Sequence, residues 1–426
     1  MLVEHKDRAL QEGAYFYRQS AAQAELYFIR KEIHVITGVR RCGKSHLMRM
    51  LMRHLVDRDK INPRQLLYLN FEDERFVDFE ISDFQRLYEV FLDLEQPDGK
   101  KYFFLDELQN VAHWQRWVNR LYEFTDIKMF ITGSNATMLS GEIATSLTGR
   151  NRIIELYPFS FAEFTLARGS RPGRRDFFKP EIKASLMGLF NRYLAIGGFP
   201  EPIKTRDTSI LQDYFRDILY RDIVARHGLK NVRQLKELAL YLAANPGCLI
   251  SLKTLKNIMA VKSQGTVKNY LGHLEDTFLF FKVDLFSYSL KQQIYNPSKI
   301  YCIDHGLAAA VGFKFSADIG RTMENIVCIE LKRQGHEIYY WHNDQGVEVD
   351  FVLKQGNDIA AIIQVCRTLE KEATRQREIR GGLAAAQEFK LDRVTIITEN
   401  TWREEKHEGI FFDIVPIWKW LLDHTE

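Results

Sequence analysis

Residues 38–45 read Gly-Val-Arg-Arg-Cys-Gly-Lys-Ser, and this stretch decides the fold of the N-terminal part of the chain. It matches the pattern G-x-x-x-x-G-K-[ST] at every fixed position. The apolar run Ile33–Thr37 before it predicts a strand. The residues after it predict a helix, because four apolar side chains share one face: Leu47, Leu51, Met52 and Leu55. A strand, a glycine-rich loop and a helix N-terminus in this order predict a phosphate-binding loop.

Such a loop suits a nucleoside triphosphate. Its glycines let backbone N–H groups approach the anion, and the helix dipole favours negative charge. Lys44 is expected to reach the β- and γ-phosphates, and Ser45 to ligate Mg²⁺. For Arg40 and Arg41 the alternative is that they are solvated charges beside the loop. ATP and Mg²⁺ are the predicted ligands, and the residues predicted to contact the nucleotide are Gly38, Val39, Arg40, Arg41, Cys42, Gly43, Lys44, Ser45 and His46.

The composition is that of an ordinary soluble globular protein. The chain has 426 residues, of which 46% are hydrophobic and 27% charged, enough for two or three domains. No apolar run approaches the ~18 residues of a membrane span. The N-terminus is charged from its fourth residue, and the five cysteines form no C-x-x-C pair, so reduced thiols in the cytoplasm are expected. A net charge of +3 does not by itself indicate a nucleic-acid partner.

Four further apolar runs follow the loop, at 66–71, 102–106, 129–132 and 153–156. Helical patterns separate them. Continuously apolar strands that alternate with helices are typical of a parallel sheet covered on both faces. The predicted fold class is therefore α/β, with a parallel-sheet ATPase core.

The second of these runs ends in the acidic pair Asp106-Glu107. An acidic pair at the end of a strand is common, but here it follows a phosphate loop with one strand between. In that context it is a Walker B signature: Asp106 is expected to hold Mg²⁺, and Glu107 to orient and polarise the attacking water. The sequence therefore predicts hydrolysis of ATP and not only its binding.

Two later positions are candidates for contact with the reacting phosphate. Thr132-Gly133-Ser134-Asn135 ends the next strand, and Asn135 is the predicted sensor of the γ-phosphate; a simple turn is the alternative. Arg150 stands just before the fifth strand, where an arginine often projects into the nucleotide of a neighbouring subunit. A solvated surface arginine is the other interpretation of Arg150. The first interpretation implies a homo-oligomer.

The strings GVRRCGKS, FFLDELQ, ITGSNA, LTGR and LYPFSFAEF resemble a family of bacterial and archaeal AAA-type ATPases of the additional-strand class. The resemblance implies an ATPase core followed by a winged helix and a C-terminal domain of the PD-(D/E)xK nuclease fold. Residues 197–200, Gly-Gly-Phe-Pro, resemble the glycine-proline motif in the lid of signal-transducing ATPases, which implies that Pro200 lies near the nucleotide base. From the residues alone they are a helix stop and a turn. The predicted domains are the core at 1–165, a helical lid at 166–225, the winged helix at 226–310 and the nuclease-like domain at 311–426.

The middle segment predicts a winged helix-turn-helix. A short helix at 250–259, with Ser251 as its cap, is followed by a second helix from Ser263 and by strand-like runs at 279–286 and 300–303. One interpretation places the outer face of the second helix on duplex or branched DNA. The other is a lid or protein-docking module. The residues predicted to face DNA are Lys262, Gln264, Lys268 and Asn269.

The C-terminal segment is similar to the PD-(D/E)xK fold, with Glu324 on a first helix and Asp350 on a hairpin strand. Such nucleases hold Mg²⁺ with two carboxylates and use a lysine two residues after the second acid. Asp350 matches the first acid, but Gln364 and Cys366 stand where the second acid and the lysine belong. Glutamine lacks the charge a divalent ion needs, and cysteine supplies no fixed cation. We expect a degenerate site.

The sequence thus favours a cytoplasmic, Mg²⁺-dependent ATPase whose turnover drives a conformational change coupled to DNA, with no membrane partner. One alternative is an ATP-gated DNA nuclease. Another is a signalling switch that binds ATP and recruits proteins without contacting DNA.

Overall fold

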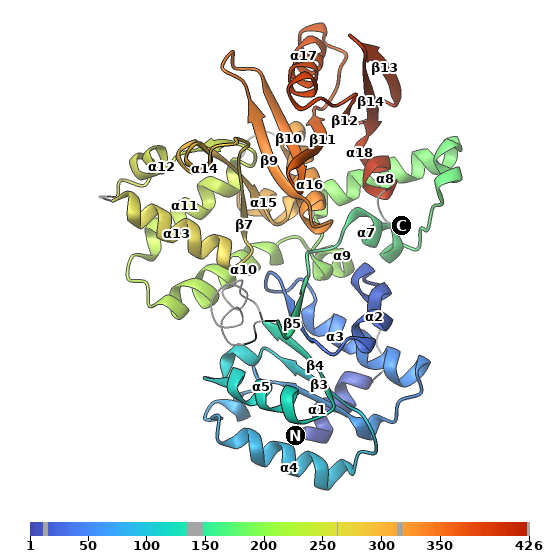
Figure 1. Cartoon of the computed structure of the whole chain (residues 1–426), viewed down its shortest axis with the longest axis vertical. Coiled ribbons are helices and arrows are strands. Elements are labelled where there is room, and N and C mark those ends of the chain that lie inside the picture. Colours follow the sequence, from blue (N-terminus) through green and yellow to red (C-terminus); the bar gives the residue numbers. More distant parts are fainter. Residues whose placement is uncertain (12–15, 134–146, 148, 262, 313–317, 424–426) are drawn as a thin grey trace. The chain divides into compact units, whose positions relative to one another are not determined.

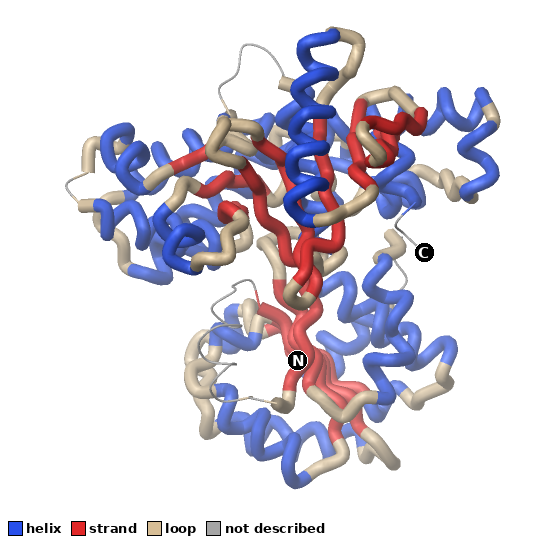
Figure 2. The backbone as a smooth tube through the Cα atoms, turned by 45° about the horizontal axis from the view of Figure 1, so that its top comes forward, coloured by secondary structure: helices blue, strands red, loops and turns tan. Residues whose placement is uncertain are grey.

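The computed structural model describes residues 1–11, 16–133, 147, 149–261, 263–312 and 318–423 (Figures 1 and 2). The chain forms two compact units. The first comprises Met1–Tyr157 with Asp276–Phe278, and the second Pro158–Glu275 with Leu279–Glu426. The predicted end of the core at residue 165 lies close to the first boundary. The three later predicted domains lie within the second unit, except for Asp276–Phe278 of the predicted winged helix, which belong to the first. Among the described residues, no helix is both long and apolar enough to span a bilayer.

The first unit is built on a five-stranded sheet in the order β2-β3-β4-β1-β5, and every pair of neighbours is parallel. This confirms the predicted α/β class. β4 lies between β1 and β3, so the strand that carries the phosphate loop is not adjacent to the strand that carries the acidic pair. The strands are β1 (Ile33–Thr37), β2 (Leu66–Asn70), β3 (Lys101–Asp106), β4 (Ile127–Gly133) and β5 (Asn151–Glu155).

Helices cover both faces of this sheet, because its central strands are apolar on both faces: β1 and β4 are buried along their whole length. Side chains of α4 and α5 pack against one face, and α2 and α3 lie on the other. α1 runs against the edge strand β2 and contacts both α3 and, through Leu2, the cluster beneath α4 and α5. The helices are α1 (Leu2–Leu10), α2 (Ala24–Ile29), α3 (Lys44–Arg53), α4 (Asp83–Glu95) and α5 (Trp114–Phe124).

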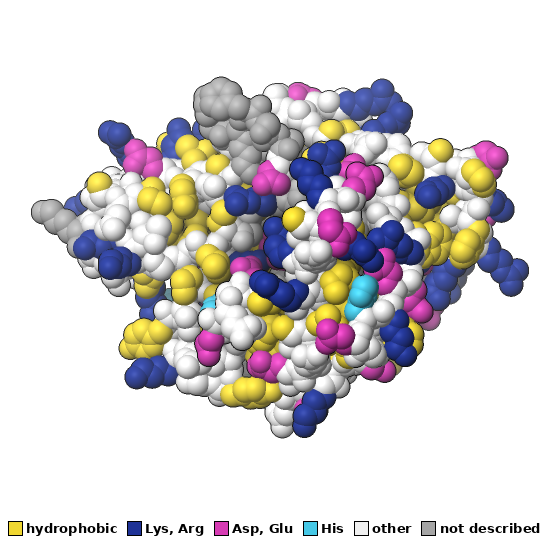
Figure 3. Space-filling view, turned by 90° about the horizontal axis from the view of Figure 1, so that it is seen from above, with side chains coloured by type: hydrophobic (Ala, Val, Ile, Leu, Met, Phe, Trp, Pro, Cys, Tyr) yellow, Lys and Arg dark blue, Asp and Glu magenta, His cyan; other side chains and the backbone are white. Residues whose placement is uncertain are grey.

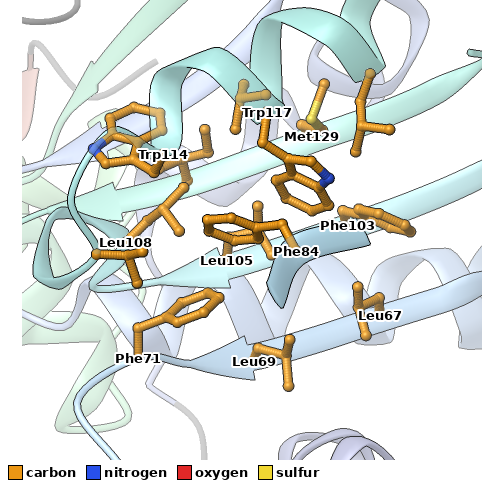
Figure 4. Close-up of a cluster of buried hydrophobic side chains, with 14 of the residues drawn as sticks. Leu67, Leu69, Phe71, Phe84, Phe103, Leu105, Leu108, Trp114, Trp117 and Met129 are labelled. Carbon is orange, nitrogen blue, oxygen red and sulfur yellow. The ribbon is translucent and has the colours of Figure 1, made fainter. Parts of the chain in front are cut away.

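An aromatic cluster fills the space between the sheet and α4 and α5 (Figure 4). The rings of Phe84 and Trp117 stack with their centroids 4.4 Å apart, and Phe103 of β3 lies against Trp117. Offset-stacked rings of this kind are favourable beyond the apolar area they bury. The cluster therefore fixes the distance between helices and sheet, and with it the carboxyl edge where β1 and β3 end.

The second unit contains a mixed nine-stranded sheet in the order β13-β14-β12-β11-β10-β9-β7-β8-β6. β7 pairs in parallel with β9, through Asp284 opposite Tyr339, so the sheet is continuous across the predicted domain boundary at 310/311. The strands are β6 (Leu249–Ile250), β7 (Phe280–Leu285), β8 (Ser298–Cys302), β9 (Glu337–His342), β10 (Glu348–Gln355), β11 (Asp358–Val365), β12 (Arg393–Thr398), β13 (Arg403–His407) and β14 (Ile410–Pro416).

The helices of the second unit are mostly short, and they fall into two groups along the chain. In the sequence, α7 to α16 come before β9 and alternate with β6, β7 and β8, whereas α17 follows β11 and α18 follows β14. They are α7 (Phe161–Ala167), α8 (Pro180–Ile196), α9 (Pro200–Thr205), α10 (Ile210–Asp217), α11 (Val232–Ala244), α12 (Leu252–Ile258), α13 (Gln264–Asp276), α14 (Leu290–Tyr295), α15 (His305–Val311), α16 (Ile319–Arg333), α17 (Glu372–Phe389) and α18 (Ile417–Asp423).

The middle segment follows the predicted order of elements. Ser251 caps α12, because its Oγ accepts a hydrogen bond from the N–H of Thr254 at 3.1 Å. The predicted start of this helix at Ile250 is wrong, since Ile250 belongs to β6 and pairs with β8. The apolar stripe of α13 is buried as its helical spacing requires, and it consists of Val267, Tyr270, Leu271 and Leu274.

Candidate functional site

The phosphate loop begins where β1 ends, and α3 begins at Lys44. Gly38 has φ +146° and Gly43 has φ +104°, conformations that other residues rarely adopt. A Cβ at Gly38 would lie 2.0 Å from the carbonyl oxygen of Leu156, so the loop packs directly on the backbone after β5. The two glycines of the motif are therefore required by backbone geometry, and the loop opens toward the N-terminus of α3.

Lys44 is folded over this loop, and its side chain is only 4% exposed. Its Nζ donates to the carbonyl oxygens of Gly38 at 3.1 Å and Val39 at 3.3 Å, and lies 4.0 Å from Oε1 of Glu107. The ammonium group is thus held between the loop and the acidic pair, where a γ-phosphate would sit in a loop of this type.

Asp106 is the buried acid at the end of β3. Its Oδ2 accepts from the hydroxyl of Tyr68 at 2.9 Å, and its Oδ1 accepts from the hydroxyl of Thr132 at 2.5 Å. Burial raises the pKa of Asp106, with a further contribution from Glu107, while hydrogen bonds from Thr132, Ser45 and Tyr68 lower it. The carboxylate of Asp106 and the hydroxyl of Ser45 lie together, and oxygen ligands of this kind suit Mg²⁺.

Glu107 is held in an unusual backbone conformation, with φ +54°. Its N–H donates to Oγ1 of Thr132 at 2.8 Å, and its Oε2 accepts from the side-chain amide of Gln109 at 2.5 Å. The hydroxyl of Thr132 thus accepts from the backbone of one acid and donates to the carboxylate of the other. A left-handed conformation costs a non-glycine residue free energy, and such strain is concentrated at functional sites.

The remaining loop residues have different surroundings. Arg40 donates to Oε1 of Glu72 at 3.0 and 3.2 Å, and Arg41 is exposed. Cys42 is fully buried, and burial raises the pKa of its thiol. Burial also lowers the pKa of His46 to about 4, so this imidazole is neutral at pH 7. Of the five cysteines, only Cys248 is partly exposed; the other four are buried.

Arg150 lies at the opposite edge of the sheet from the phosphate loop. Its carbonyl oxygen accepts from the N–H of Ile33, the first residue of β1, whereas the loop follows the last. Its guanidinium contacts α5 through Asn119 at 3.0 Å and Glu123 at 2.5 Å. Within one chain the structure does not bring Arg150 to the loop. The predicted sensor Asn135 lies outside the described residues.

Pro200 lies in the second unit, as the first residue of α9. The turn before it is tightly held, because the N–H of Gly198 donates to Oδ2 of Asp304 at 2.7 Å and its carbonyl accepts from the N–H of Phe159 at 2.6 Å. The predicted contact of Pro200 with a base stays a prediction.

The described candidates for DNA contact lie on the exposed side of α13: Gln264, Lys268 and Asn269. Lys262 lies outside the described residues. On the face drawn in Figure 3, Lys and Arg side chains alternate with Asp and Glu and form no single basic stripe. On this face, contact with DNA would therefore depend on local side chains and not on a broad positive field.

A second cluster of charges lies in the second unit, and the sequence predicted only part of it. Lys299 of β8 places its Nζ 2.7 Å from Oε1 of Glu348, 3.0 Å from Oδ1 of Asp350 and 3.1 Å from Oε1 of Glu324. The hydroxyl of Tyr301 donates to the same oxygen of Glu324 at 2.6 Å. The lysine side chain is 4% exposed. An internal ammonium group thus lies among three carboxylates.

The four predicted residues of the degenerate nuclease site do come together here. Oε1 of Gln364 accepts from the N–H of Asp350 at 2.9 Å, and Cys366 lies close enough to Asp350 for its carboxylate to raise the thiol pKa. Burial is the larger cause, and the pKa of Cys366 is about 12. Among the described residues, no group of three or more His, Cys, Asp or Glu side chains has the arrangement of a metal site.

Three carboxylates share one ammonium group, so they are not all easily ionised together. Burial and the neighbouring Asp350 raise the pKa of Glu324 to about 7, although Lys299 and Tyr301 lower it. Burial by itself lowers the pKa of Lys299, but the carboxylates outweigh it, and the pKa rises well above its usual range. Lys299 therefore stays charged at pH 7 and is the counterion of the whole cluster.

Several of these side chains escaped the sequence analysis. Thr132 was noted only as part of a turn, and Tyr68 and Tyr301 only as members of apolar runs. The sequence does mark Lys299, because it lies two residues before Tyr301 in a buried strand and therefore on the same face. A lysine on the buried face of a strand requires a partner of opposite charge, and Glu324 and Asp350 were already candidates.

Replacing Lys299 with methionine should lower the free energy of unfolding by about 3–5 kcal/mol near pH 7.5, because it leaves the largely shielded carboxylates of Glu324 and Asp350 without a cation. The loss should be smaller near pH 5. The pKa of Glu324 is raised to about 7 in the folded chain, so near pH 5 its carboxyl is protonated and needs no cation. The contribution of Glu324 to the free energy of unfolding is fully present below its ordinary pKa and is lost as the pH rises through about 7.

Urea unfolding at the two pH values, followed by circular dichroism, measures this difference. The matched control is Lys282→Met on β7, whose lysine is 42% exposed and pairs with Asp284 at 3.2 Å. A loss that is equal for the two variants, or that does not change with pH, would contradict the proposed counterion role.

Comparison with known proteins places these two units in a family. A family model described as an AAA domain matches residues 30–165. Two models described as domains of unknown function match residues 187–318 (DUF8612) and 319–420 (DUF4143). Among solved structures, AMPPCP-bound DnaA from Aquifex aeolicus is 13% identical, covers 60% of this chain and 86% of its own, and has a TM-score of 0.29. Similarity at that level carries no argument about function.

Two relatives match most of the chain. An uncharacterized protein of Methanocaldococcus jannaschii is 34% identical over 418 residues, which cover 94% of this chain and 90% of that protein. An uncharacterized protein of Haemophilus influenzae is 36% identical over 338 residues, which cover 77% of this chain and 80% of that protein. The chain therefore contains an AAA-type P-loop ATPase domain and belongs to the family of these uncharacterized Methanocaldococcus and Haemophilus proteins.

Proposed function

We propose that the chain hydrolyses ATP with Mg²⁺ at the carboxyl edge of the five-stranded sheet. The observation that carries the proposal is the bonding of Asp106 and Glu107 to one hydroxyl, that of Thr132, opposite the ammonium group of Lys44. This arrangement fixes one acid beside Ser45 and directs the other toward the position of a γ-phosphate. A loop that only bound nucleotide and its metal would not need Glu107 in such a conformation.

Each residue has a distinct role in this proposal. Lys44 exchanges its two carbonyl partners for the β- and γ-phosphates, and the carboxylate of Asp106 and the hydroxyl of Ser45 hold the metal. Bound there, Mg²⁺ neutralises charge on the phosphate oxygens. Glu107 orients the attacking water and accepts its proton. Asn135 is proposed as the sensor of the γ-phosphate, and Pro200 as the contact to the base that the family resemblance implies.

The placement of Arg150 supports an assembly of several copies. In its own chain it lies at the edge of the sheet opposite the loop, so a role in hydrolysis would require the nucleotide of a neighbouring copy. To do so it must exchange Asn119 and Glu123 for a phosphate. The proposed protein is therefore a homo-oligomer in which Arg150 completes the site of the next subunit.

The middle segment is proposed as a winged helix-turn-helix in contact with DNA. Its order supports this: α11, β6, α12 and α13 are followed by the antiparallel strands β7 and β8, with β6 on the other side of β8. Gln264, Lys268 and Asn269 are exposed on α13. ATP turnover would then drive a conformational change coupled to DNA.

The last segment is proposed as a nuclease-like domain without efficient cleavage. Glu324 lies on α16, Asp350 on β10 and Gln364 on β11, in the order that the resemblance implies. Lys299 lies where the carboxylates would need a divalent ion, and Gln364 carries no charge. The rival interpretation, an ATP-gated nuclease, requires that cluster to release Lys299 and bind a metal.

Replacing Glu107 with glutamine should leave ATP affinity within about threefold of wild type and lower turnover by about 10²–10⁴-fold, because the general base is lost. Phosphate release and binding of a fluorescent ATP analogue measure the two quantities. The control is Glu74→Gln, an exposed acid of the same unit. Normal turnover in Glu107→Gln would refute the assignment of the base.

If α13 contacts DNA phosphates, Lys268→Ala should weaken binding to duplex and branched DNA alike and reduce the slope of log affinity against log salt by about 1. Lys204→Ala, an exposed lysine on α9, is the control and should change neither quantity. Fluorescence anisotropy over a range of salt concentrations measures both. No binding by wild type at low salt would favour the protein-recruiting switch.

Wild type should cleave supercoiled plasmid no faster than Asp350→Asn does, with Mg²⁺ or Mn²⁺ and ATP present. The reason is that Lys299 already neutralises the carboxylates. Asp358→Asn, at an exposed position, is the control. Cleavage that Asp350→Asn abolishes and Asp358→Asn retains would support the ATP-gated nuclease instead.

A further inference from the structure

We infer that Arg18 positions the phosphate loop for nucleotide binding, an inference that rests on the proposed ATP site. Arg18 precedes β1 and belongs to no part of the motif, yet its side chain is buried, with 1% of the residue exposed. Its Nη1 donates to the carbonyl oxygen of Cys42 and its Nη2 to that of Tyr157, both at 2.6 Å. A fully buried guanidinium group is costly unless its donors are satisfied, so its presence at the loop calls for a reason.

The first of these bonds sets the orientation of a loop peptide. The peptide between Cys42 and Gly43 is planar and trans, so its C=O and N–H point in opposite directions. Because Arg18 holds the carbonyl of Cys42 on the protein side, the N–H of Gly43 points away from the guanidinium and into the concave side of the loop. Backbone N–H groups on that side bind phosphate oxygens. Arg18 thereby prepares one donor before the nucleotide arrives.

The conformation of Gly43 agrees with this role. Gly43 has φ +104°, and a Cβ built on it would lie 3.2 Å from Nη1 of Arg18. The guanidinium group thus packs closely against the second glycine of the motif. The requirement for glycine here has two sources, the backbone conformation and the neighbouring arginine. Burial is the largest influence on both loop neighbours, raising the pKa of the Cys42 thiol and lowering that of His46. The charge of Arg18 also reaches them, since it opposes the first shift and adds to the second.

The second bond connects the loop to the end of the first unit. Tyr157 is the last residue of that unit before Pro158, and it follows Leu156, whose N–H donates to the carbonyl of Thr37 at 2.7 Å. Arg18 therefore links three segments distant in sequence: the stretch before β1, the phosphate loop and the exit from β5. It is a positioning residue, because its donors contact backbone carbonyls that shape the loop.

The test compares Arg18→Ala, Arg18→Lys and wild type in the full chain, by affinity for a fluorescent ATP analogue and by the kcat and KM of ATP hydrolysis. Loss of a charged hydrogen bond that orients the loop should weaken nucleotide affinity in Arg18→Ala by about 10- to 100-fold. KM should rise by a similar factor, with kcat changed by less than about threefold, because Glu107 and Asp106 are untouched. Arg18→Lys should bind the ATP analogue more tightly than Arg18→Ala but more weakly than wild type, since a single ammonium group replaces a guanidinium group that donates to two carbonyl oxygens.

Chemical rescue separates positioning from general stability. Added guanidinium at low millimolar concentration should restore ATP affinity of Arg18→Ala several-fold, whereas methylammonium at the same ionic strength should not. Arg30→Ala, an exposed arginine after α2, is the matched control and should behave as wild type. Wild-type affinity in Arg18→Ala would overturn the inference, as would a loss that guanidinium does not relieve and that follows the unfolded fraction.

The two proposals fail in different ways. If wild type binds ATP but does not hydrolyse it, the proposed hydrolysis is wrong, while weaker binding by Arg18→Ala still supports the positioning role. If wild type hydrolyses ATP and Arg18→Ala binds and hydrolyses it equally well, only the role of Arg18 is wrong. If wild type does not bind ATP, both are wrong.

Discussion

The placement of β4 between β1 and β3 is the constraint on which the candidate active site depends. Because β4 pairs with both, Thr132 near its carboxyl end lies beside the end of β3, and one hydroxyl reaches both Asp106 and Glu107. A sheet in which β1 and β3 were direct neighbours would leave no strand to supply that hydroxyl. The aromatic layer beneath α4 and α5 then keeps the strand ends in register, so that local sequence and long-range packing specify the same edge.

The sequence was sufficient for features that depend on neighbours along the chain. The loop, its two flanks and the five strands of the first unit were predicted because apolar runs, glycine spacing and the acidic pair are local patterns. It was not sufficient for Tyr68 and Arg18, whose partners lie 24 to 139 residues away. Nothing in their surroundings along the chain marks them. Their importance appears only when the strands have been placed side by side.

The same distinction explains the second unit. The order of helices and strands in the middle segment followed from hydrophobic periodicity and turns, but the pairing of β7 with β9 did not. That pairing is short and joins segments more than fifty residues apart, so no local pattern reports it. It places β7, and β8 beyond it, in one sheet with the C-terminal strands. Lys299, from the middle segment, can for that reason reach carboxylates on α16 and β10.

This cluster also shows how several acids can lie together in one site. Glu324 and Asp350, which are largely shielded from solvent, and the more exposed Glu348 would repel one another without a cation. An ammonium group fixed to the backbone supplies the charge permanently, and no supply of metal is needed. The cluster then joins three elements of the second unit, α16, β8 and β10, and so has a structural role.

The burial of four of the five cysteines has a practical consequence. Cys42 lies within the phosphate loop, but its thiol is buried and its pKa is raised, so maleimide reagents should not reach it in the folded chain. Cys248 alone is partly exposed, in the turn between α11 and β6. The natural chain thus offers one site for a fluorescent or spin label, in the segment proposed to contact DNA, without mutation of the ATP-binding loop.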